Sequence, residues 1–214
     1  MNWKLPKQLT VGRIALAVVF FTLLGLYEHG AVSGAWLLNT AFVVYIVAGI
    51  TDVLDGWLAR RWQVTSAFGR IADPFVDKVL VVGAFAMLAG ANFAMPPGAA
   101  RFERDLPWWL TGHMASAVQA WMVVAIMARE FIVSAVRGYS ESRGQKFPAT
   151  YAGKIKMFVQ SVAICTVLYQ QAKFPQAQWA IVLKIVMVWL AVVVTVVSGL
   201  AYAGKTAKLL KSDE

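Results

Sequence analysis

Four aspartates have a spacing that would bring their carboxylates together. They are Asp52, Asp55, Asp73 and Asp77. On a helix, residues three or four positions apart share a face, so Asp52 and Asp55 lie on one stripe and Asp73 and Asp77 on another. If the stripes face each other, four carboxylates meet and need a cationic partner. All-oxygen ligands favour Mg²⁺, Mn²⁺ or Ca²⁺ over zinc or copper, and four carboxylates could hold two ions.

Small residues accompany the aspartates on the same faces. Gly56 and Ala59 continue the first stripe, and Gly69 precedes the second. With almost no side chain, they would let a bulky phosphate ester approach two ions, which could neutralise a pyrophosphate as its bond breaks. Small residues also allow close packing of membrane helices, and for the glycines alone both interpretations stand. Combined with the aspartate spacing, the pattern favours a phosphate-transfer site.

A second group of charged residues interrupts a later apolar run. The group consists of Arg129, Glu130, Ser134 and Arg137, followed by Lys154 and Lys156 at the start of the next run. We expect Arg129 and Glu130 to face the interior of a bundle, because charge inside a membrane avoids lipid. Arginine forks match phosphate oxygens, so the group is a candidate site for a second anion. Anchoring at the membrane surface is the alternative, and it is the favoured interpretation for Lys156 and Arg143.

Long apolar segments must position these residues. Of the 214 residues, 59% are hydrophobic and 14% charged, whereas soluble domains have about a quarter charged residues. A membrane-crossing helix needs about 20 apolar residues, and helices satisfy the backbone in hydrocarbon. We expect an all-α membrane protein, a single domain over residues 1–214 with six transmembrane helices in one bundle. The expected spans are 9–27, 35–60, 68–95, 118–138, 152–172 and 178–203.

Two details of these segments affect the site. Met1–Lys7 carries Trp3 and two lysines and resembles a short interfacial segment lying on an anionic leaflet. Pro74 lacks a backbone N–H group, so the third helix either begins near Asp73 or kinks at Pro74. The sequence leaves both possibilities open.

The distribution of lysine and arginine gives the orientation. The net charge is +9, but the positive residues lie in the loops and at the ends of the apolar runs. This pattern is explained by the positive-inside rule and does not indicate a nucleic-acid partner. Residues 1–13, 60–70, 137–156 and 205–211 carry most of the positive charge and fall on one side of the membrane. We therefore expect both termini and the carboxylates to face the cytoplasm.

The complete pattern around the aspartates is similar to the signature of the CDP-alcohol phosphotransferases. That signature reads Asp-x2-Asp-Gly-x2-Ala-Arg-x8-Gly-x3-Asp-x3-Asp, and every spacing is kept between Asp52 and Asp77. The resemblance implies a core of six transmembrane helices, a homodimer, and two Mg²⁺ or Mn²⁺ ions on the four aspartates. It also implies that Asp77 is the general base. The CDP group would be bound by Gly56, Ala59, Arg60 and Gly69.

The second charged group resembles one bacterial branch of that family, whose acceptor is glycerol-3-phosphate. Leu5–Arg13 resembles the same branch, and Thr10 and Arg13 would border the nucleotide. The resemblance implies that the phosphatidyl group of CDP-diacylglycerol moves to glycerol-3-phosphate at the bacterial cytoplasmic membrane, among its lipids, with release of CMP. It assigns the acceptor phosphate to Arg129, Arg137, Lys154 and Lys156.

Other acceptors and another class of protein stay open. Inositol phosphate is also anionic and would use the same basic residues, and phosphatidylglycerol is a further candidate. Serine is zwitterionic and has less need of four cations. A cation transporter could use the four aspartates as its ion site, but such sites lie near the midplane of repeated halves, and these aspartates have no counterpart later in the chain.

Overall fold

The computed structural model describes residues 5–31, 33–62, 67–96, 102–143 and 151–211. Within these ranges the chain forms helices and one isolated bridge between Ala94 and Met114, so the all-α prediction is confirmed for the described residues. The long helices are α1 (Leu5–Gly25), α2 (Gly34–Trp62), α3 (Ala67–Leu88), α6 (Ala120–Ser142), α7 (Tyr151–Lys173) and α8 (Gln178–Lys211). Three short elements lie between α3 and α6: η1 (Ala91–Phe93), α4 (Phe102–Asp105) and α5 (Trp108–Thr111).

The six long helices correspond to the six expected segments, with differences at their ends. α1 begins at Leu5, so Leu5–Lys7 are the first residues of that helix, and the position of Met1–Lys7 on a membrane surface stays a prediction. Met1–Lys4 lie outside the described residues. α8 continues to Lys211, beyond the expected end of the last span.

α3 ends at Leu88, earlier than expected. A Cβ atom at Gly90 would lie 2.9 Å from the carbonyl oxygen of Met87, so the chain turns there in a way that a larger residue would obstruct. In the following η1, the Asn92 side chain donates a hydrogen bond of 3.0 Å to the carbonyl oxygen of Gly25. This bond satisfies a backbone acceptor at the end of α1, a position that helical bonding leaves open.

The position of Pro74 within α3 is now defined. α3 begins at Ala67, so Pro74 lies inside the helix and the alternative that the helix starts near Asp73 is wrong. Because proline has no N–H group, α3 lacks one backbone hydrogen bond at this point. The backbone hydrogen bonding of α3 is therefore interrupted at Pro74, between Asp73 and Asp77.

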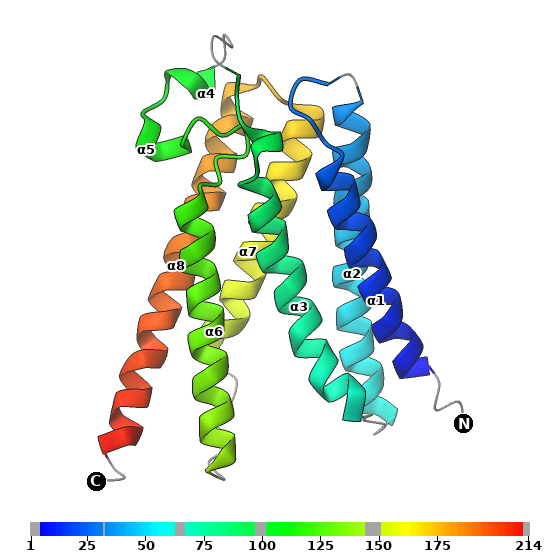
Figure 1. The fold of residues 1–214 in the computed structure, drawn as a ribbon, viewed down its shortest axis with the longest axis vertical. Helices are drawn as coiled ribbons and strands as arrows, with labels where there is room; N and C mark the ends of the chain where they lie inside the picture. The colour runs from blue at the N-terminus through cyan, green and yellow to red at the C-terminus, as the bar shows by residue number, and fades with distance from the viewer. Residues whose placement is uncertain (1–4, 32, 63–66, 97–101, 144–150, 212–214) are drawn as a thin grey trace.

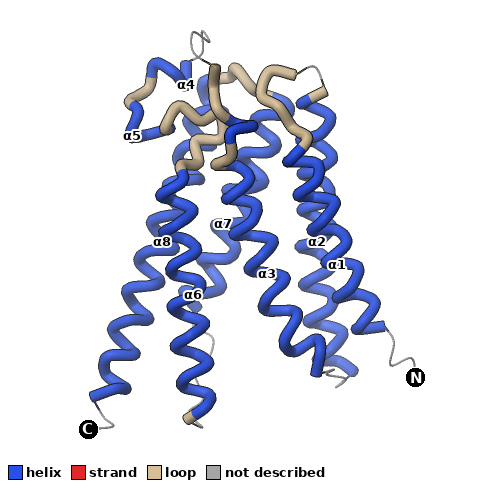
Figure 2. The backbone as a smooth tube through the Cα atoms, viewed as in Figure 1, coloured by secondary structure: helices blue, strands red, loops and turns tan. Residues whose placement is uncertain are grey.

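The long helices pack closely at one end of the molecule and diverge toward the other (Figure 1). The packed end carries α4 and α5, and the loops also gather there (Figure 2). α1 begins and α8 ends at the diverging end (Figure 1). Residues of the main apolar core come from all six helices and include Phe20, Leu24, Leu38, Phe85, Leu88, Met122, Ile126, Ile164, Leu168 and Val188. The candidate carboxylates belong to the diverging end, away from this core.

Polar side chains fasten the loops at the packed end. The Ser116 hydroxyl donates to the carbonyl oxygen of Leu88 at 2.6 Å, which ties the segment before α6 to the end of α3. The ammonium group of Lys184 in α8, which is fully buried, donates to the carbonyl oxygen of Ala115 at 2.6 Å. Buried polar groups need such partners. The packed end is therefore held by hydrogen bonds as well as by apolar contacts.

Among the described residues, two helices contain stretches that are long and apolar enough to cross a membrane, by length and composition. They are Gly34–Leu54, with 21 residues, and Gln178–Tyr202, with 25 residues. These stretches indicate association with a membrane. Six spans are not confirmed by this measure, since the described apolar stretches Val11–Gly25 and Lys78–Leu88 are shorter, and α6 and α7 contain charged residues such as Glu130 and Lys156.

The contact between α1 and α3 generates a prediction on stability. A Cβ atom at Gly83 would lie 2.5 Å from the ring of Phe21, whereas nothing lies within 4 Å of the corresponding position at Gly138. We expect Gly83→Ala to destabilise the folded state by about 1–3 kcal/mol through overpacking. Gly138→Ala, which adds the same methyl group in open space on α6, is the matched control. Thermal unfolding in one detergent measures both, and an equal midpoint for the two variants would contradict the close packing.

Candidate active site

The four aspartates lie on consecutive helices at the diverging end. Asp52 and Asp55 belong to α2, and Asp73 and Asp77 belong to α3. The last residue of α2 and the first of α3 are five positions apart in the chain, so these two ends are separated by at most about 18 Å. The side chains of Asp55, Asp73 and Asp77 lie outside the described residues. That their carboxylates converge stays a prediction.

The residues expected to hold the CDP group are placed by their helices. Gly56, Ala59 and Arg60 lie in the last turns of α2, and Gly69 lies in the first turn of α3. Thr10 lies in α1. The side chains of these positions are outside the described part of the chain.

Asp52 makes an ion pair with Arg13. The distance from Arg13 Nη1 to Asp52 Oδ1 is 2.9 Å, and it joins α1 to α2. The Arg13 side chain is 4% exposed and that of Asp52 is 30% exposed. One of the expected metal ligands and one of the expected nucleotide residues are therefore in direct contact, and the arginine fixes the orientation of the carboxylate.

Both residues line a cavity of about 490 Å³ between α2 and α7. Apart from this ion pair, the cavity walls are mainly apolar and include Leu54, Leu80 and Phe158. A partly exposed carboxylate that opens into a cavity is suited to bind a divalent cation through oxygen. Among the residues whose side chains are described, no group of three or more His, Cys, Asp or Glu gathers around it. The donor chemistry of Asp52 therefore fits the expected metal, and the other three ligands stay predicted.

Glu130 is the centre of the second charged group. Its carboxylate Oε1 accepts a hydrogen bond of 3.0 Å from Arg129 Nη1 and a short one from Lys156 Nζ. All three residues are buried. Arg129 also packs against α8, where its guanidinium lies 5.5 Å from the centre of the Tyr202 ring. Glu130 thus links α6 to α7 directly and, through Arg129, is connected to α8.

A polar cavity lies beside this group. It has a volume of about 210 Å³ and is formed by α3, α6 and α7. Its charged lining residues are Lys78, Glu130, Arg137 and Lys156. Three cations and one carboxylate leave an excess of positive charge around the space. The cavity is therefore suited to an anion.

Unsatisfied polar atoms support this assignment. Arg137 Nε and Gln160 Oε1 belong to residues lining the cavity, and both atoms are buried without a hydrogen-bond partner among the described residues. Buried polar atoms are normally satisfied, so each such atom indicates a missing partner. A bound ligand with both donor and acceptor groups, such as a hydroxylated phosphate ester, would supply partners for both.

The two cavities are neighbours. Val81 of α3 and Met157 of α7 line both of them. One cavity is mainly apolar and contains Asp52, and the other is cationic. A mainly apolar cavity thus lies beside a cationic one, and their chemistry suits an apolar ligand and a small anion respectively.

The four residues expected to bind the acceptor phosphate have different surroundings in the structure. Arg137 and Lys156 line the cationic cavity. Arg129 is buried beside it with Glu130, as expected for a residue facing the bundle interior. Lys154 is exposed on α7. The interpretation of Lys156 as a surface anchor is wrong, because Lys156 is buried and paired with Glu130.

Lys78 was missed by the reasoning from sequence. Its ammonium group lines the cationic cavity and donates a short hydrogen bond to the hydroxyl of Ser134, whose own hydroxyl donates to the carbonyl oxygen of Glu130 at 2.6 Å. The available signal was its place in the sequence, directly after Asp77 and at the start of an apolar stretch. A lysine there must avoid lipid, so it would face the interior.

Comparison with known proteins identifies the family of the chain. The family model of the CDP-alcohol phosphatidyltransferases matches residues 3–197. The chain is 30% identical over 99% of its length to the CDP-diacylglycerol–glycerol-3-phosphate 3-phosphatidyltransferase of Bacillus subtilis (strain 168), of which 99% is covered. It is also 30% identical over 94% of both chains to the enzyme with the same name from Shigella flexneri serotype 5b (strain 8401). The chain therefore belongs to the CDP-alcohol phosphatidyltransferase family.

Proposed function

We propose that this chain transfers the phosphatidyl group of CDP-diacylglycerol to glycerol-3-phosphate, giving phosphatidylglycerophosphate and CMP. The observation that carries the proposal is the cationic cavity of Lys78, Arg137 and Lys156 next to the cavity that contains Asp52. The names of the relatives support the same substrates. A lipid donor and a small phosphorylated acceptor match the contrasting character of the two cavities.

The donor site is formed by the family signature. Asp52, Asp55, Asp73 and Asp77 would hold two divalent ions, Mg²⁺ or Mn²⁺, which when bound supply positive charge to the pyrophosphate of the lipid. Arg13 orients Asp52 through their ion pair. The CDP group is assigned to residues of the same helices together with the start of α1, namely Gly56, Ala59, Arg60, Gly69, Thr10 and Arg13.

The acceptor site is formed by the cationic cavity. Arg137 and Lys78 bind the phosphate of glycerol-3-phosphate by charge-assisted hydrogen bonds. Lys156 contributes to the same site while Glu130 fixes its position. Arg129 holds Glu130 in place from the side of α8, and the exposed Lys154 attracts the anion from solvent.

The reacting groups meet between the two sites. Asp77 directly precedes Lys78 in α3, so an acceptor bound at Lys78 lies close to the Asp77 position. Asp77 takes the proton of the acceptor 1-hydroxyl as general base. The oxygen attacks the phosphorus that carries diacylglycerol, the bond from that phosphorus to CMP breaks, and CMP leaves. Arg60 stabilises the negative charge that develops on the departing phosphate.

The protein is proposed to lie in the bacterial cytoplasmic membrane with six spans. Because six long helices alternate in direction, α1 begins and α8 ends at the same end of the bundle (Figure 1). Tryptophans are exposed at the opposite, packed end, in α2, α5 and α8: Trp36, Trp108, Trp109 and Trp179. Such residues favour a membrane interface on either side. A cytoplasmic position for the diverging end, both termini and the active site is supported by the basic residues Arg137, Arg143 and Lys154, which lie near the end of α6 and at the start of α7. We also propose that the protein forms a homodimer, because the family resemblance implies one.

The function is tested by CMP release from CDP-diacylglycerol in detergent. We expect release with glycerol-3-phosphate and Mg²⁺ or Mn²⁺, loss of release when a chelator removes the metal, and no release from Asp77→Asn protein. Inositol phosphate and serine, offered separately, are the control acceptors. CMP release with either of them and not with glycerol-3-phosphate would contradict the assignment of glycerol-3-phosphate as the acceptor. Folded protein that releases no CMP with any acceptor would overturn the reaction.

The cationic cavity generates a second prediction. Arg137→Ala removes a charged donor, and hydrogen bonds to charged groups are worth about 1.5–3 kcal/mol, so KM for glycerol-3-phosphate should rise about 10–100-fold. KM for CDP-diacylglycerol should change little, because that lipid occupies the other cavity. Arg143→Ala is the matched control, since Arg143 is exposed directly after the end of α6 and donates a hydrogen bond of 2.9 Å to the Tyr139 hydroxyl. An equal rise of both KM values in Arg137→Ala would contradict two separate sites.

A further inference from the structure

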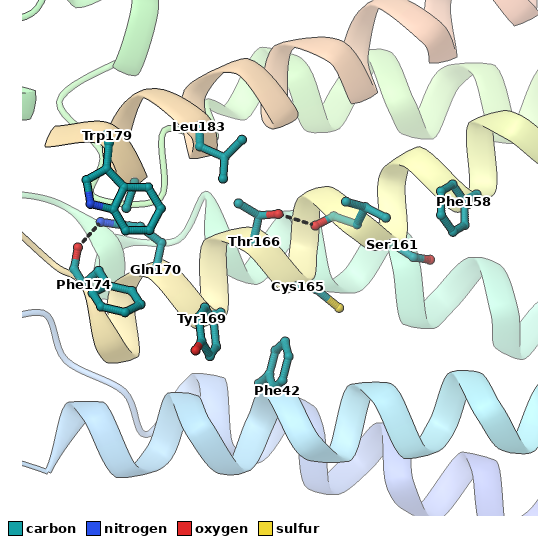
Figure 3. A pocket seen from close by; sticks show the side chains of 12 residues that line it. Phe42, Phe158, Ser161, Cys165, Thr166, Tyr169, Gln170, Phe174, Trp179 and Leu183 are labelled. Atoms are coloured by element: carbon teal, nitrogen blue, oxygen red, sulfur yellow. Dashed lines mark hydrogen bonds between the residues drawn. The ribbon is translucent and has the colours of Figure 1, made fainter. Parts of the chain in front are cut away.

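A second apolar cavity continues from the one that contains Asp52. It has a volume of about 460 Å³ and lies over the outward face of α7, between α2 and the start of α8 (Figure 3). Phe158, Ser161 and Cys165 line both cavities. Together they form one continuous groove, which we call the α7 groove. It begins at the Arg13–Asp52 ion pair and runs toward the packed end.

The α7 groove has charge at one end and an apolar wall along its length. From Asp52 toward the packed end, its lining includes Phe158, Cys165 and Leu183. The hydroxyl of Tyr45, which also lines it, is bound to Ser161 Oγ at 3.3 Å. An occupant of matching chemistry has a charged head and a long apolar tail, as a phospholipid does.

The length of the groove agrees with one leaflet. Asp52 and Phe42 are ten residues apart on α2, which is about 15 Å along a helix. Half of a hydrocarbon core of about 30 Å is the same distance. A chain that starts at Asp52 therefore reaches Phe42 at the depth where the acyl chains of one leaflet end.

Aromatic rings stand at this depth. The ring centres of Phe42 and Tyr169 are 5.6 Å apart, and the two side chains point toward each other from α2 and α7 (Figure 3). The ring centres of Tyr169 and Phe174 are 6.0 Å apart, and those of Phe174 and Trp179 are 5.4 Å apart. This row of rings lines the groove from the depth that a chain of one leaflet would reach toward the packed end.

We propose that the α7 groove binds one acyl chain of the lipid substrate and that the Phe42–Tyr169 pair limits the chain length it accepts. The proposal rests on the proposed function, since the head of that lipid is assigned to the aspartates at the end of the groove. A lipid tail matches the groove at both ends, because the charged head of the same lipid accounts for the charged end at Asp52 and the tail for the apolar walls.

The first test uses CDP-diacylglycerol with a photoreactive diazirine at the end of one acyl chain, in detergent-solubilised wild-type protein. We expect adducts at Phe42, Tyr169 and their neighbours, identified by mass spectrometry. The control is a phosphatidylcholine with the same tail, which should label these residues much less. Equal labelling by both lipids would show a groove for bulk lipid only. A cross-link between two chains at Phe42 or Tyr169 would show that a second copy covers it. Both results would overturn the proposal.

The second test fills or extends the groove. Cys165→Trp should lower kcat/KM for dipalmitoyl relative to dihexanoyl CDP-diacylglycerol about tenfold, the effect of roughly two methylene groups left unburied. Phe42→Ala should shift the preference toward chains longer than palmitoyl. Val124→Trp, on an exposed face of α6, should leave the ratio unchanged and controls for folding. If Cys165→Trp leaves the ratio of the two kcat/KM values unchanged, the proposal that the α7 groove binds an acyl chain is wrong. Absence of turnover in wild-type protein would instead overturn the proposed function, and the photolabelling would still report on the groove.

Discussion

A buried carboxylate constrains the arrangement of the diverging half of the bundle. Glu130 lies in the low-dielectric interior, and an unpaired charge there would cost several kcal/mol, so its two cationic partners must stay in place. Arg129 comes from the same helix and Lys156 from α7. Gly199 of α8 makes room for this arrangement, because a Cβ there would lie 2.9 Å from Arg129 Cγ. The ion pairs therefore fix α6, α7 and α8 at the level of the cationic cavity.

The two ends of the bundle differ in how closely their helices pack. Apolar residues of all six long helices pack toward the end that carries α4 and α5. At the other end the helices diverge (Figure 1), and the two cavities that meet at Val81 and Met157 lie between them. A rigid packed end thus supports a separated end, where a lipid and a small anion can reach one reaction centre from different sides.

The sequence predicted the six long helices well, because apolar runs of such length have few other structures. It also predicted that Arg129 and Glu130 face inward. It failed for Lys156, since the partner of that lysine is 26 residues away on another helix and no periodic pattern reports such a pair. The contact of Arg13 with Asp52 joins two helices in the same way. The end of α3 was misplaced because apolar residues continue past the turn at Gly90.

The role of Glu130 is tested most directly by thermal unfolding of Glu130→Gln, Lys156→Met and the double variant in one detergent. Glu130→Gln should cost about 3–5 kcal/mol, because it leaves buried cations without their counter-charge. Lys156→Met should cost less, since Arg129 still pairs with Glu130. Adding Lys156→Met to Glu130→Gln should then recover part of the lost stability. Losses that simply add in the double variant would contradict the account, because they would mean that the two groups do not interact.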